Sequence, residues 1–414
     1  MAEQSVFARE GFPSPVGPIP FLGLAVLSQT ASSLVQQGVP VLGAFLQARF
    51  HLSLAGMGMT VSASTLGMMV SFAVAGSLAD RLGPRRLLFW GSLGTAMAAL
   101  AAAQANTLPA LVVTLFLVGG TLATVPSAGM KAVFSAFAGR ARGLPMGIRQ
   151  TGVPVGAALA AFFLPTIVGG VGWHRLFETF AAVLLVVGVG FSRVIPPGGE
   201  APPSGVRSRR LPWAPLVAPM VVALLMAAGQ YDVLTFSIPD LVRHGGLSLA
   251  QAGTVLAAAQ IGGGVARIGF GWWSDRMGGN RPRMMLVCAG LGTLGALGAA
   301  VLPGRLPVWG LGGVWFALGM GAVGWNALLA TWSAERVDPS HAGFAMSATA
   351  TTVFIGAALN PPLFGAVVDH WHHFYWGWLT LAAILAAAGA VLWRAGAGST
   401  ADAGAGSLGA QASS

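Results

Sequence analysis

The chain has few charged residues, and this shortage limits the kinds of protein it can be. Only 8% of its 414 residues are Asp, Glu, Lys or Arg, while 55% are hydrophobic. The mean hydropathy is +0.73. Soluble domains carry about 25% charged residues. The composition therefore excludes an ordinary soluble protein and predicts a chain with many segments inside a lipid bilayer.

Cysteine and catalytic motifs are also scarce. The single cysteine, Cys288, lies in an apolar segment, which excludes a disulfide framework. The glycines at 262–264 are not followed by Lys-Ser/Thr, so they form no phosphate loop. We find no pairing of a nucleophile with a base and therefore expect no enzyme, no cofactor and no bound metal. The histidines of DHWHHF (369–374) lie among tryptophans, which indicates an interfacial aromatic belt.

Long apolar runs are what the chain has in abundance. Roughly twenty apolar residues cross a bilayer as a helix, whereas barrel strands are half as long and alternate in polarity. We therefore predict an all-α membrane protein with twelve transmembrane helices. The first run is too long for a signal peptide and is kept as helix 1. The runs lie near 20–47, 55–79, 87–105, 108–137, 143–169, 175–195, 213–242, 249–273, 284–302, 306–333, 343–368 and 374–394.

The positive charges are unevenly placed along the chain, whose net charge is +10. With the amino terminus inside, fifteen of the twenty-two Lys and Arg residues fall on the cytoplasmic side. Four fall outside and three lie within spans. Cytoplasmic loops of membrane proteins carry such an excess. We therefore predict a multi-pass protein of the bacterial cytoplasmic (inner) membrane with both termini cytoplasmic, and we do not interpret the charge as nucleic-acid binding.

The two halves of the sequence repeat. GSLADRLGPRR (76–86) and GWWSDRMGGNRPR (271–283) share the frame G-x-x-x-D-R-x-G at an offset of 195 residues. GLPMGIRQTGVPVGAAL (143–159) matches GFAMSATATTVFIGAAL (343–359) at an offset of 200. Such repeats are typical of secondary transporters. We predict an N-terminal segment (1–19), two six-helix bundles (20–195 and 213–394), a linker (196–212) and a disordered tail (395–414).

On these motifs the chain resembles the major facilitator superfamily. The resemblance implies two pseudo-symmetric six-helix bundles that open a central site alternately to each side, in a monomer. Helices 1, 4, 7 and 10 would line the site, helix 5 would pack on helix 8 and helix 2 on helix 11. We accordingly expect the glycines Gly152 and Gly156, with Pro154, to pack helix 5 closely against helix 8.

The resemblance also assigns a cytoplasmic gate to the repeated loop motif. Asp80 would lie beside the start of helix 11 and Asp275 beside the start of helix 5, where a helix amino terminus stabilises a carboxylate. The glycines of the motif would be turn and packing positions. The alternative is that its basic residues only fix the topology. The residues assigned to the gate are Gly76, Asp80, Arg81, Gly83, Arg85, Arg86, Gly271, Asp275, Arg276 and Gly278.

Four ionisable residues fall inside predicted spans: Lys131, Arg149, Arg267 and Asp232. Such residues are costly in a bilayer and are functional by default. At 1.5 Å per residue, the three cations lie about 10–13 Å from the cytoplasmic edge of the membrane. The positions that correspond to Arg149 and Arg267 in the other half of the repeat hold uncharged residues. This one-sided cluster predicts binding of an anion. Lys131 could instead reach the interface with its long side chain, and the arginines could bind backbone carbonyls.

Arg267, in ARIGFGWWSD, resembles the helix-8 arginine of monocarboxylate and oxalate carriers, which implies a carboxylate substrate because a guanidinium offers paired donors. The chain departs from those carriers at Gly263, where they have an aspartate, and it lacks their helix-1 lysine. Asp232 is predicted to couple transport to protons, since burial and a nearby arginine shift the pKa of a carboxylate in opposite directions. A fixed ion pair or a water-exposed position is the alternative.

Polar residues complete the predicted cavity. Residues 29, 33 and 36 share one face of helix 1, although amides in membranes often only join helices. The predicted neutral binding residues are Gln29, Ser33, Gln36, Gln150, Gln230, Tyr231, Gln260, Trp325, Asn326 and Asn360.

The predicted function is secondary transport of a small organic anion, a mono- or dicarboxylate, by proton symport or anion exchange. The alternative is a proton-coupled exporter of drugs or other amphiphiles, whose helix-5 motif GVPVG (152–156) partly matches. A receptor that binds without transporting is a third possibility.

Overall fold

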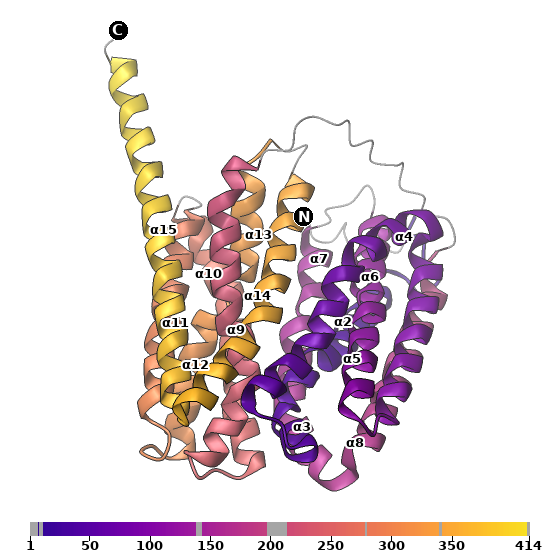
Figure 1. Cartoon of the computed structure of the whole chain (residues 1–414). Coiled ribbons are helices and arrows are strands. Elements are labelled where there is room, and N and C mark those ends of the chain that lie inside the picture. The colour runs from indigo at the N-terminus through magenta and orange to yellow at the C-terminus, as the bar shows by residue number, and fades with distance from the viewer. Residues whose placement is uncertain are drawn as a thin grey trace. The chain divides into compact units, whose positions relative to one another are not determined.

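The computed structural model describes residue 7 and residues 11–137, 143–196, 213–277, 280–338 and 342–411. Within these ranges the regular structure is helical, with no strand (Figure 1). This confirms the predicted all-α class. The predicted linker lies almost entirely outside the described residues.

The helices of the first half run from α2 to α8. Their bounds are α2 Pro18–Val41, α3 Gly43–Phe50, α4 Leu54–Ala103, α5 Leu108–Leu122, α6 Thr124–Ala136, α7 Gly143–Gln150 and α8 Gly152–Val194. The second half contains the short 3-10 helix η1 and α9 to α15. Their bounds are η1 Ala214–Leu216, α9 Val217–Arg243, α10 Leu249–Arg276, α11 Arg281–Val301, α12 Val308–Val323, α13 Asn326–Glu335, α14 Ala342–Trp371 and α15 Phe374–Gln411.

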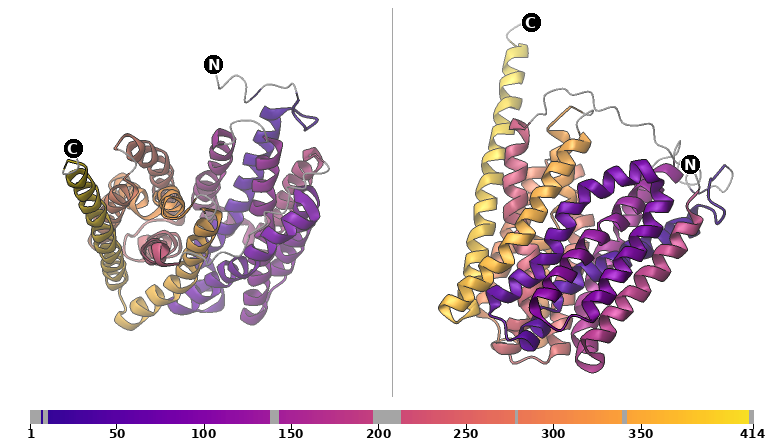
Figure 2. Two further views of the ribbon diagram at one scale, coloured as in Figure 1. Left: turned by 90° about the horizontal axis from the view of Figure 1, so that it is seen from above. Right: turned by 45° about the vertical axis from the view of Figure 1, so that its right-hand side comes forward.

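The chain divides into two compact units. The first comprises Met1–Arg207 with Leu234–Val242 and Leu247–Ala257, and the second comprises Ser208–Val233, Arg243–Gly246 and Ala258–Ser414. One end of α9 and one end of α10 thus belong to the first unit. Within each unit the long helices run side by side (Figures 1 and 2).

Eleven described segments are long and apolar enough to cross a membrane. One of them, Pro145–Val194, has 50 residues, which is enough for two crossings. This segment turns at Gly172, where φ is +77°, a backbone conformation that glycine adopts without strain. The pattern is therefore consistent with the twelve predicted spans.

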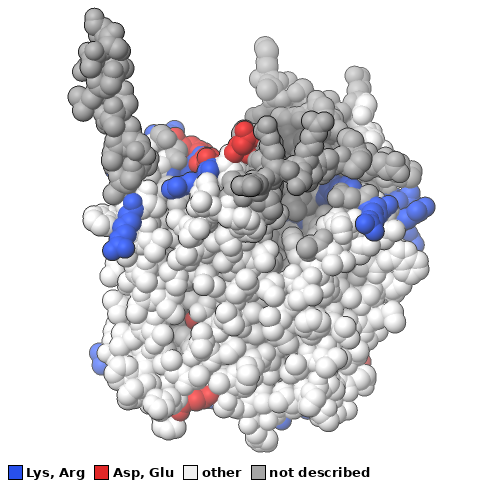
Figure 3. Space-filling view, turned by 45° about the horizontal axis from the view of Figure 1, so that its top comes forward, with Lys and Arg blue, Asp and Glu red and all other residues white. Residues whose placement is uncertain are grey.

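The surface of the molecule agrees with a bilayer environment. Figure 3 shows Lys, Arg, Asp and Glu gathered near two ends, with a broad uncharged band between them. Large apolar side chains stand fully outward, among them Trp309 at 82% exposure and Ile268 at 71%. Contiguous exposed apolar surface on this scale marks contact with lipid or a partner.

The internal repeat is visible in how each unit packs. In the first unit a Cβ on Gly67 would overlap the carbonyl oxygen of Phe116, and a Cβ on Gly119 would overlap that of Ser64. In the second unit a Cβ on Gly262 would overlap the carbonyl oxygen of Phe316, and a Cβ on Gly319 would overlap that of Ala259. These pairs are related by the offsets of 195 and 200 residues found in the sequence, so the same close helix contact occurs once in each unit.

The fourth helix of each repeat is broken at an equivalent place. In the first unit α5 ends at Leu122 and α6 begins at Thr124, and in the second unit α12 ends at Val323 and α13 begins at Asn326. The residues between the two parts, Ala123 in one unit and Gly324 and Trp325 in the other, keep a helical backbone, so each break is a local irregularity within one span.

The end of the chain differs from the prediction. The Gly/Ala/Ser-rich composition of 395–414 predicts disorder, but α15 continues to Gln411. Alanine has the highest intrinsic helix propensity of any residue, and the alanines of this segment offset its glycines.

Candidate functional site

Arg149 is the most deeply buried cation of the first unit. It stands one residue before the end of α7, and only 2% of its surface is exposed. Its Nη2 donates to Oε1 of Gln29 on α2 at 2.5 Å and to the carbonyl of Pro126 on α6 at 3.0 Å. Its Nε is buried without a hydrogen-bond partner among the described residues. The guanidinium thus joins three helices through neutral acceptors and keeps one unused donor.

Gly129 makes room for this guanidinium. A Cβ on Gly129 would lie 2.9 Å from Nη2 and 3.2 Å from Nε of Arg149. The flat guanidinium therefore rests against the backbone of α6. Gly129 could not be predicted from the sequence, because a glycine in an apolar helix carries no signal of what packs against it from another helix.

The glycines after Arg149 pack differently from the prediction. A Cβ on Gly152 would lie 2.8 Å from the carbonyl oxygen of Val26, and one on Gly156 would lie 2.8 Å from the amide nitrogen of Leu34. Both neighbours belong to α2, so the expected close packing of these glycines against helix 8 is wrong. Helix α10 approaches α8 further along, where Gly253 lies against Ala161.

Arg267 lies at the broken helix of the second unit. Its Nε donates to the carbonyl of Val323 at 3.2 Å, and Tyr231 is close enough to interact with it electrostatically. Val323 is the last residue of α12, so its carbonyl is among those that lose their helical partner at the break. Arg267 is half-buried, unlike Arg149.

Polar side chains of helices α9 and α13 meet beside the same break. Nδ2 of Asn326 donates to Oε1 of Gln230 at 2.9 Å and to the Val323 carbonyl at 3.2 Å. Gln230 stands 201 residues after Gln29, which binds Arg149 in the first unit. Each unit therefore places a glutamine from its first helix and an arginine from elsewhere near its broken fourth helix.

The remaining neutral residues take several positions. Oγ of Ser33 donates to the carbonyl of Val153 at 2.8 Å, joining α2 to α8. Trp325 is buried and donates to the carbonyl of Ala322 at 2.8 Å. Gln260 is buried, and its Nε2 has no hydrogen-bond partner among the described residues. Gln36 is half-buried and Gln150 is exposed.

Lys131 lies at the loop motif. Its Nζ donates to the carbonyl of Ala79 on α4 at 2.8 Å, and Ala79 directly precedes Asp80 of the motif. This contact favours the gate over the substrate site as the place where Lys131 acts. The side chain of Asp80 lies outside the described residues.

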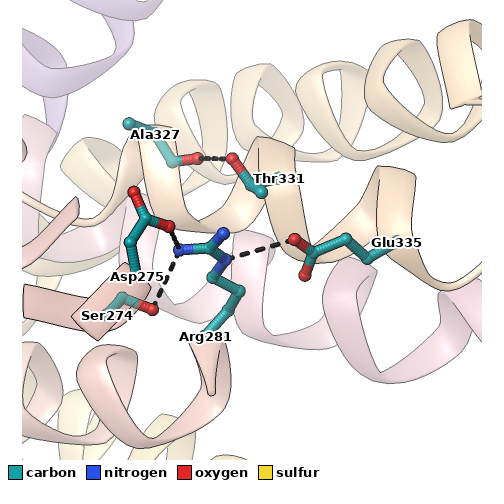
Figure 4. A network of polar contacts seen from close by, with 6 residues as sticks. All are labelled: Ser274, Asp275, Arg281, Ala327, Thr331 and Glu335. Carbon is teal, nitrogen blue, oxygen red and sulfur yellow. Dashed lines mark hydrogen bonds and ion pairs between the residues drawn. The ribbon is translucent and has the colours of Figure 1, made fainter. Parts of the chain in front are cut away.

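The second copy of the loop motif forms a charge network (Figure 4). Arg281 of α11 contacts Oδ1 of Asp275 at 2.5 Å and Oε1 of Glu335, the last residue of α13, at 3.3 Å. The same guanidinium donates to Oγ of Ser274 at 3.1 Å. Arg276 lies 3.9 Å from the ring centre of Trp272. Arg281 and Glu335 were not among the predicted gate residues, although the trailing arginines of the motif were a signal for the first.

The glycines of the motif do not share one role. Gly83 has a φ of +77° and marks the turn within α4, as predicted for a turn position. Gly76 and Gly271 lie inside helices, and a Cβ on either would meet nothing within 4 Å. Their helical backbone contradicts a turn at these two positions, whereas a packing role there stays a prediction. Gly278 lies outside the described residues, and Arg81, Arg85 and Arg86 are exposed.

Asp232 lines a cavity within the second unit. The cavity has a volume of about 450 Å³ and lies between α9, α14 and α15. Asp232 is only 2% exposed, and its Oδ1 has no hydrogen-bond partner among the described residues. Asn360, a predicted binding residue, lines this cavity, whereas Arg267 is not among the lining residues. The cavity therefore brings together two of the predicted site residues, Asp232 and Asn360.

Solved structures of low sequence identity share this fold. A bacterial homolog of the human lysosomal transporter Spinster matches with a TM-score of 0.75 at 15% identity, covering 92% of this chain and 98% of that one. A D-xylose-proton symporter matches with a TM-score of 0.73 at 15% identity, covering 90% and 96%. The duplicated bundles and this likeness define the fold, a multi-pass membrane protein built from two helical bundles.

Sequence comparison places the protein in a family. The family model described as Major Facilitator Superfamily matches residues 24–361 and 220–407. An uncharacterized MFS-type transporter of Mycobacterium tuberculosis is 32% identical over 367 residues, covering 86% of this chain and 81% of its relative. The chain belongs to the major facilitator superfamily, which confirms the resemblance drawn from its loop motifs.

Two further relatives have named substrates. The 3-(3-hydroxy-phenyl)propionate transporter of Escherichia coli is 28% identical, covering 67% of this chain and 70% of its own length. The gallate transporter of Pseudomonas putida is 25% identical, covering 83% and 80%.

Proposed function

We propose that the protein transports a small organic anion, a carboxylate, across the bacterial cytoplasmic membrane by alternating access. The observation that carries this proposal is Arg149, a buried permanent cation whose described partners are all neutral. A guanidinium cannot neutralise itself by losing its proton. Burying an uncompensated charge costs several kcal/mol, so an anionic ligand that pairs with Arg149 gains this energy on binding.

The geometry at Arg149 suits a carboxylate. Gln29 and Pro126 use Nη2, while Nε keeps a donor inside the site. A hydrogen bond from a guanidinium to an anion is about twice as strong as a neutral one. A carboxylate oxygen at Nε would satisfy both the charge and the unused donor.

The named relatives support the same substrate class. Gallate and 3-(3-hydroxy-phenyl)propionate, the substrates named for two of them, are carboxylates that carry a phenolic ring. A further relative is a probable nitrate/nitrite transporter of Mycobacterium tuberculosis, at 27% identity. The substrates share a negative charge, and an aromatic monocarboxylate is therefore the first candidate for this chain.

Arg267 is the second proposed ligand for the anion. It lies at the break of the fourth helix of its unit, as Arg149 lies close to the break in its own. Gln29, Gln230, Tyr231 and Asn326 surround these arginines and would orient the substrate. Alternating access would bring the anion to one arginine or both.

Coupling and gating complete the proposal. Asp232 can hold or release a proton, which suits proton symport, and anion exchange is the alternative. The loop motif with Asp80, Asp275, Arg276 and Lys131 would hold the cytoplasmic side closed. Both termini would lie in the cytoplasm, as the distribution of basic residues predicts, and the protein would act as a monomer.

Uptake into proteoliposomes tests the function. The panel contains gallate, 3-(3-hydroxy-phenyl)propionate, 4-hydroxybenzoate, nitrate and one lipophilic cation, each measured with and without an imposed proton gradient. We expect uptake of at least one carboxylate, strongly reduced in Arg149→Gln and Arg267→Gln. Arg305→Gln, which alters an exposed arginine in a loop, is the matched control. Uptake of the cation with none of the anions would favour the efflux alternative instead.

A further inference from the structure

The cavity beside Asp232 has a chemistry opposite to that of the arginine sites. We propose that it binds an amphipathic primary amine, with the ammonium group between Asp232 and Asn360 and the apolar body lying along α14 and α15. This site is separate from the proposed transport path of the anion and does not depend on the identity of that substrate.

Asp232, Asn360 and Thr380 offer acceptors to the cavity, whereas the donors His370 and Trp371 line it further along α14. Oδ1 of Asp232 is buried without a hydrogen-bond partner among the described residues. Nδ2 of Asn360 donates to the carbonyl of Gly356 at 2.7 Å, which leaves Oδ1 of this amide as an acceptor. A backbone carbonyl can only accept, so this contact fixes the orientation of the amide. Oγ1 of Thr380 donates to the carbonyl of Trp376 at 2.8 Å and likewise keeps its lone pairs.

A ligand that satisfies these acceptors must supply donors. A primary ammonium carries three N–H donors and no acceptor, whereas a quaternary ammonium has no donor and a carboxylate has no donor when ionised. An ammonium beside Asp232 would also make a charge-assisted hydrogen bond with Oδ1, which has no hydrogen-bond partner among the described residues. The acceptor set therefore selects a primary amine over an anion of similar size.

The rest of the cavity suits an apolar body. Its lining includes Leu363, Phe364, Val367, Leu381 and Ile384. Along α14 it extends from Asn360 to Trp371, about 16 Å at the helical rise of 1.5 Å per residue. The volume of about 450 Å³ lies within the range of pockets that hold drug-sized molecules. An aryl or alkyl chain on the amine would fill this space.

The cavity is accessible without unfolding. Leu363 and Trp371, which line it, are 61% and 55% exposed. Ala366, also in the lining, is exposed as well. An amphiphile can therefore enter the cavity from the surface of the second unit, and the proposed binding brings its polar end to the buried carboxylate.

Direct binding to the purified full-length protein in lipid nanodiscs tests the proposal. The probes are 4-phenylbutylamine, its trimethylammonium analogue and 4-phenylbutyrate, measured by isothermal titration. We expect the primary amine to bind at least tenfold more tightly than either analogue. Asp232→Asn should weaken amine binding at least tenfold, and Asp369→Asn, which removes a carboxylate from α14 outside the lining, should leave it unchanged.

A second variant protects the test against misfolding. Ala366→Phe fills the cavity from an exposed position and should weaken binding of the amine while the melting temperature stays near that of the wild type. Equal binding of the amine and the carboxylate to the wild type, unchanged binding in Asp232→Asn, or no binding of the amine would each overturn the proposal. These binding outcomes do not depend on whether the Arg149 variants lose carboxylate uptake. The proposal of amine binding and the proposal of anion transport can therefore be rejected independently of each other.

Discussion

Arg149 and Gly129 act together at the scale of single residues. The guanidinium lies against the backbone of α6 because position 129 has no side chain. It is held there by Gln29 and Pro126, neither of which carries a charge. A side chain in this position is placed by its neighbours and keeps its charge. Gly129 is therefore a positioning residue for the proposed anion site.

Replacing Gly129 by alanine should impair transport more than folding. The new Cβ would lie 2.9 Å from Nη2 of Arg149, and the flexible end of the arginine can move away at small cost. We expect the apparent KM for the anion to rise about tenfold, with the melting temperature changed by only a few degrees. Gly147→Ala is the control, because a Cβ there meets nothing within 4 Å. Equal KM values for the two variants would contradict the positioning role.

Gly83 and Gly76 separate two uses of glycine within one motif. Gly83 has a φ of +77° and a ψ of 156°, a conformation essentially restricted to glycine that costs a residue with a side chain about 1–3 kcal/mol. Gly76 is helical and has free space around it. Gly83→Ala should therefore lower the melting temperature clearly, and Gly76→Ala should leave it unchanged or raise it slightly, since alanine favours helices over glycine. Thermal denaturation in detergent compares the two, and an equal loss in both would show that the turn is not under strain.

At the scale of helices, the repeat and the breaks are the main features. The apolar runs predict the spans because the cost of an exposed backbone in lipid acts on each segment locally. The breaks after Leu122 and Val323 were not predicted, although Pro126, which has no N–H to donate to the Leu122 carbonyl, is a signal for the first. Contacts between side chains of distant segments also decide which residues bind Arg149. They likewise decide that Asn360, and not Arg267, lines the cavity at Asp232. Sequence thus predicts the elements and the unusual charges but not their contacts.

The network around Arg281 joins three helices of the second unit. Surface ion pairs contribute about 0–1 kcal/mol each, and Asp275 is 66% exposed. Arg281→Gln should therefore change the melting temperature little. It should lower the uptake rate several-fold, because Asp275 and Glu335 lose their shared cation at the proposed gate. Arg283→Gln is the matched control, since its side chain is exposed and contacts neither carboxylate. Identical uptake rates for the two variants would remove Arg281 from the gate.

At the scale of the whole molecule, the protein is a transporter of the major facilitator superfamily whose proposed cationic and acidic sites are built from different residues. The first unit holds Arg149, and the second holds both Arg267 and the cavity at Asp232. Such a division allows an anion to be bound by arginine while a carboxylate elsewhere responds to protons or to an amine. The central claim is that Arg149 is kept for its ligand and not for stability.

One measurement tests that claim directly: carboxylate affinity and melting temperature of purified Arg149→Met compared with the wild type. Methionine keeps an unbranched stem and removes the buried charge. We predict that affinity for the transported carboxylate falls about tenfold to a hundredfold, the effect of a charged hydrogen bond of about 1.5–3 kcal/mol. The melting temperature should stay the same or rise, because an uncompensated buried charge is gone. A protein that melts many degrees lower yet binds the carboxylate as tightly as the wild type would contradict the account.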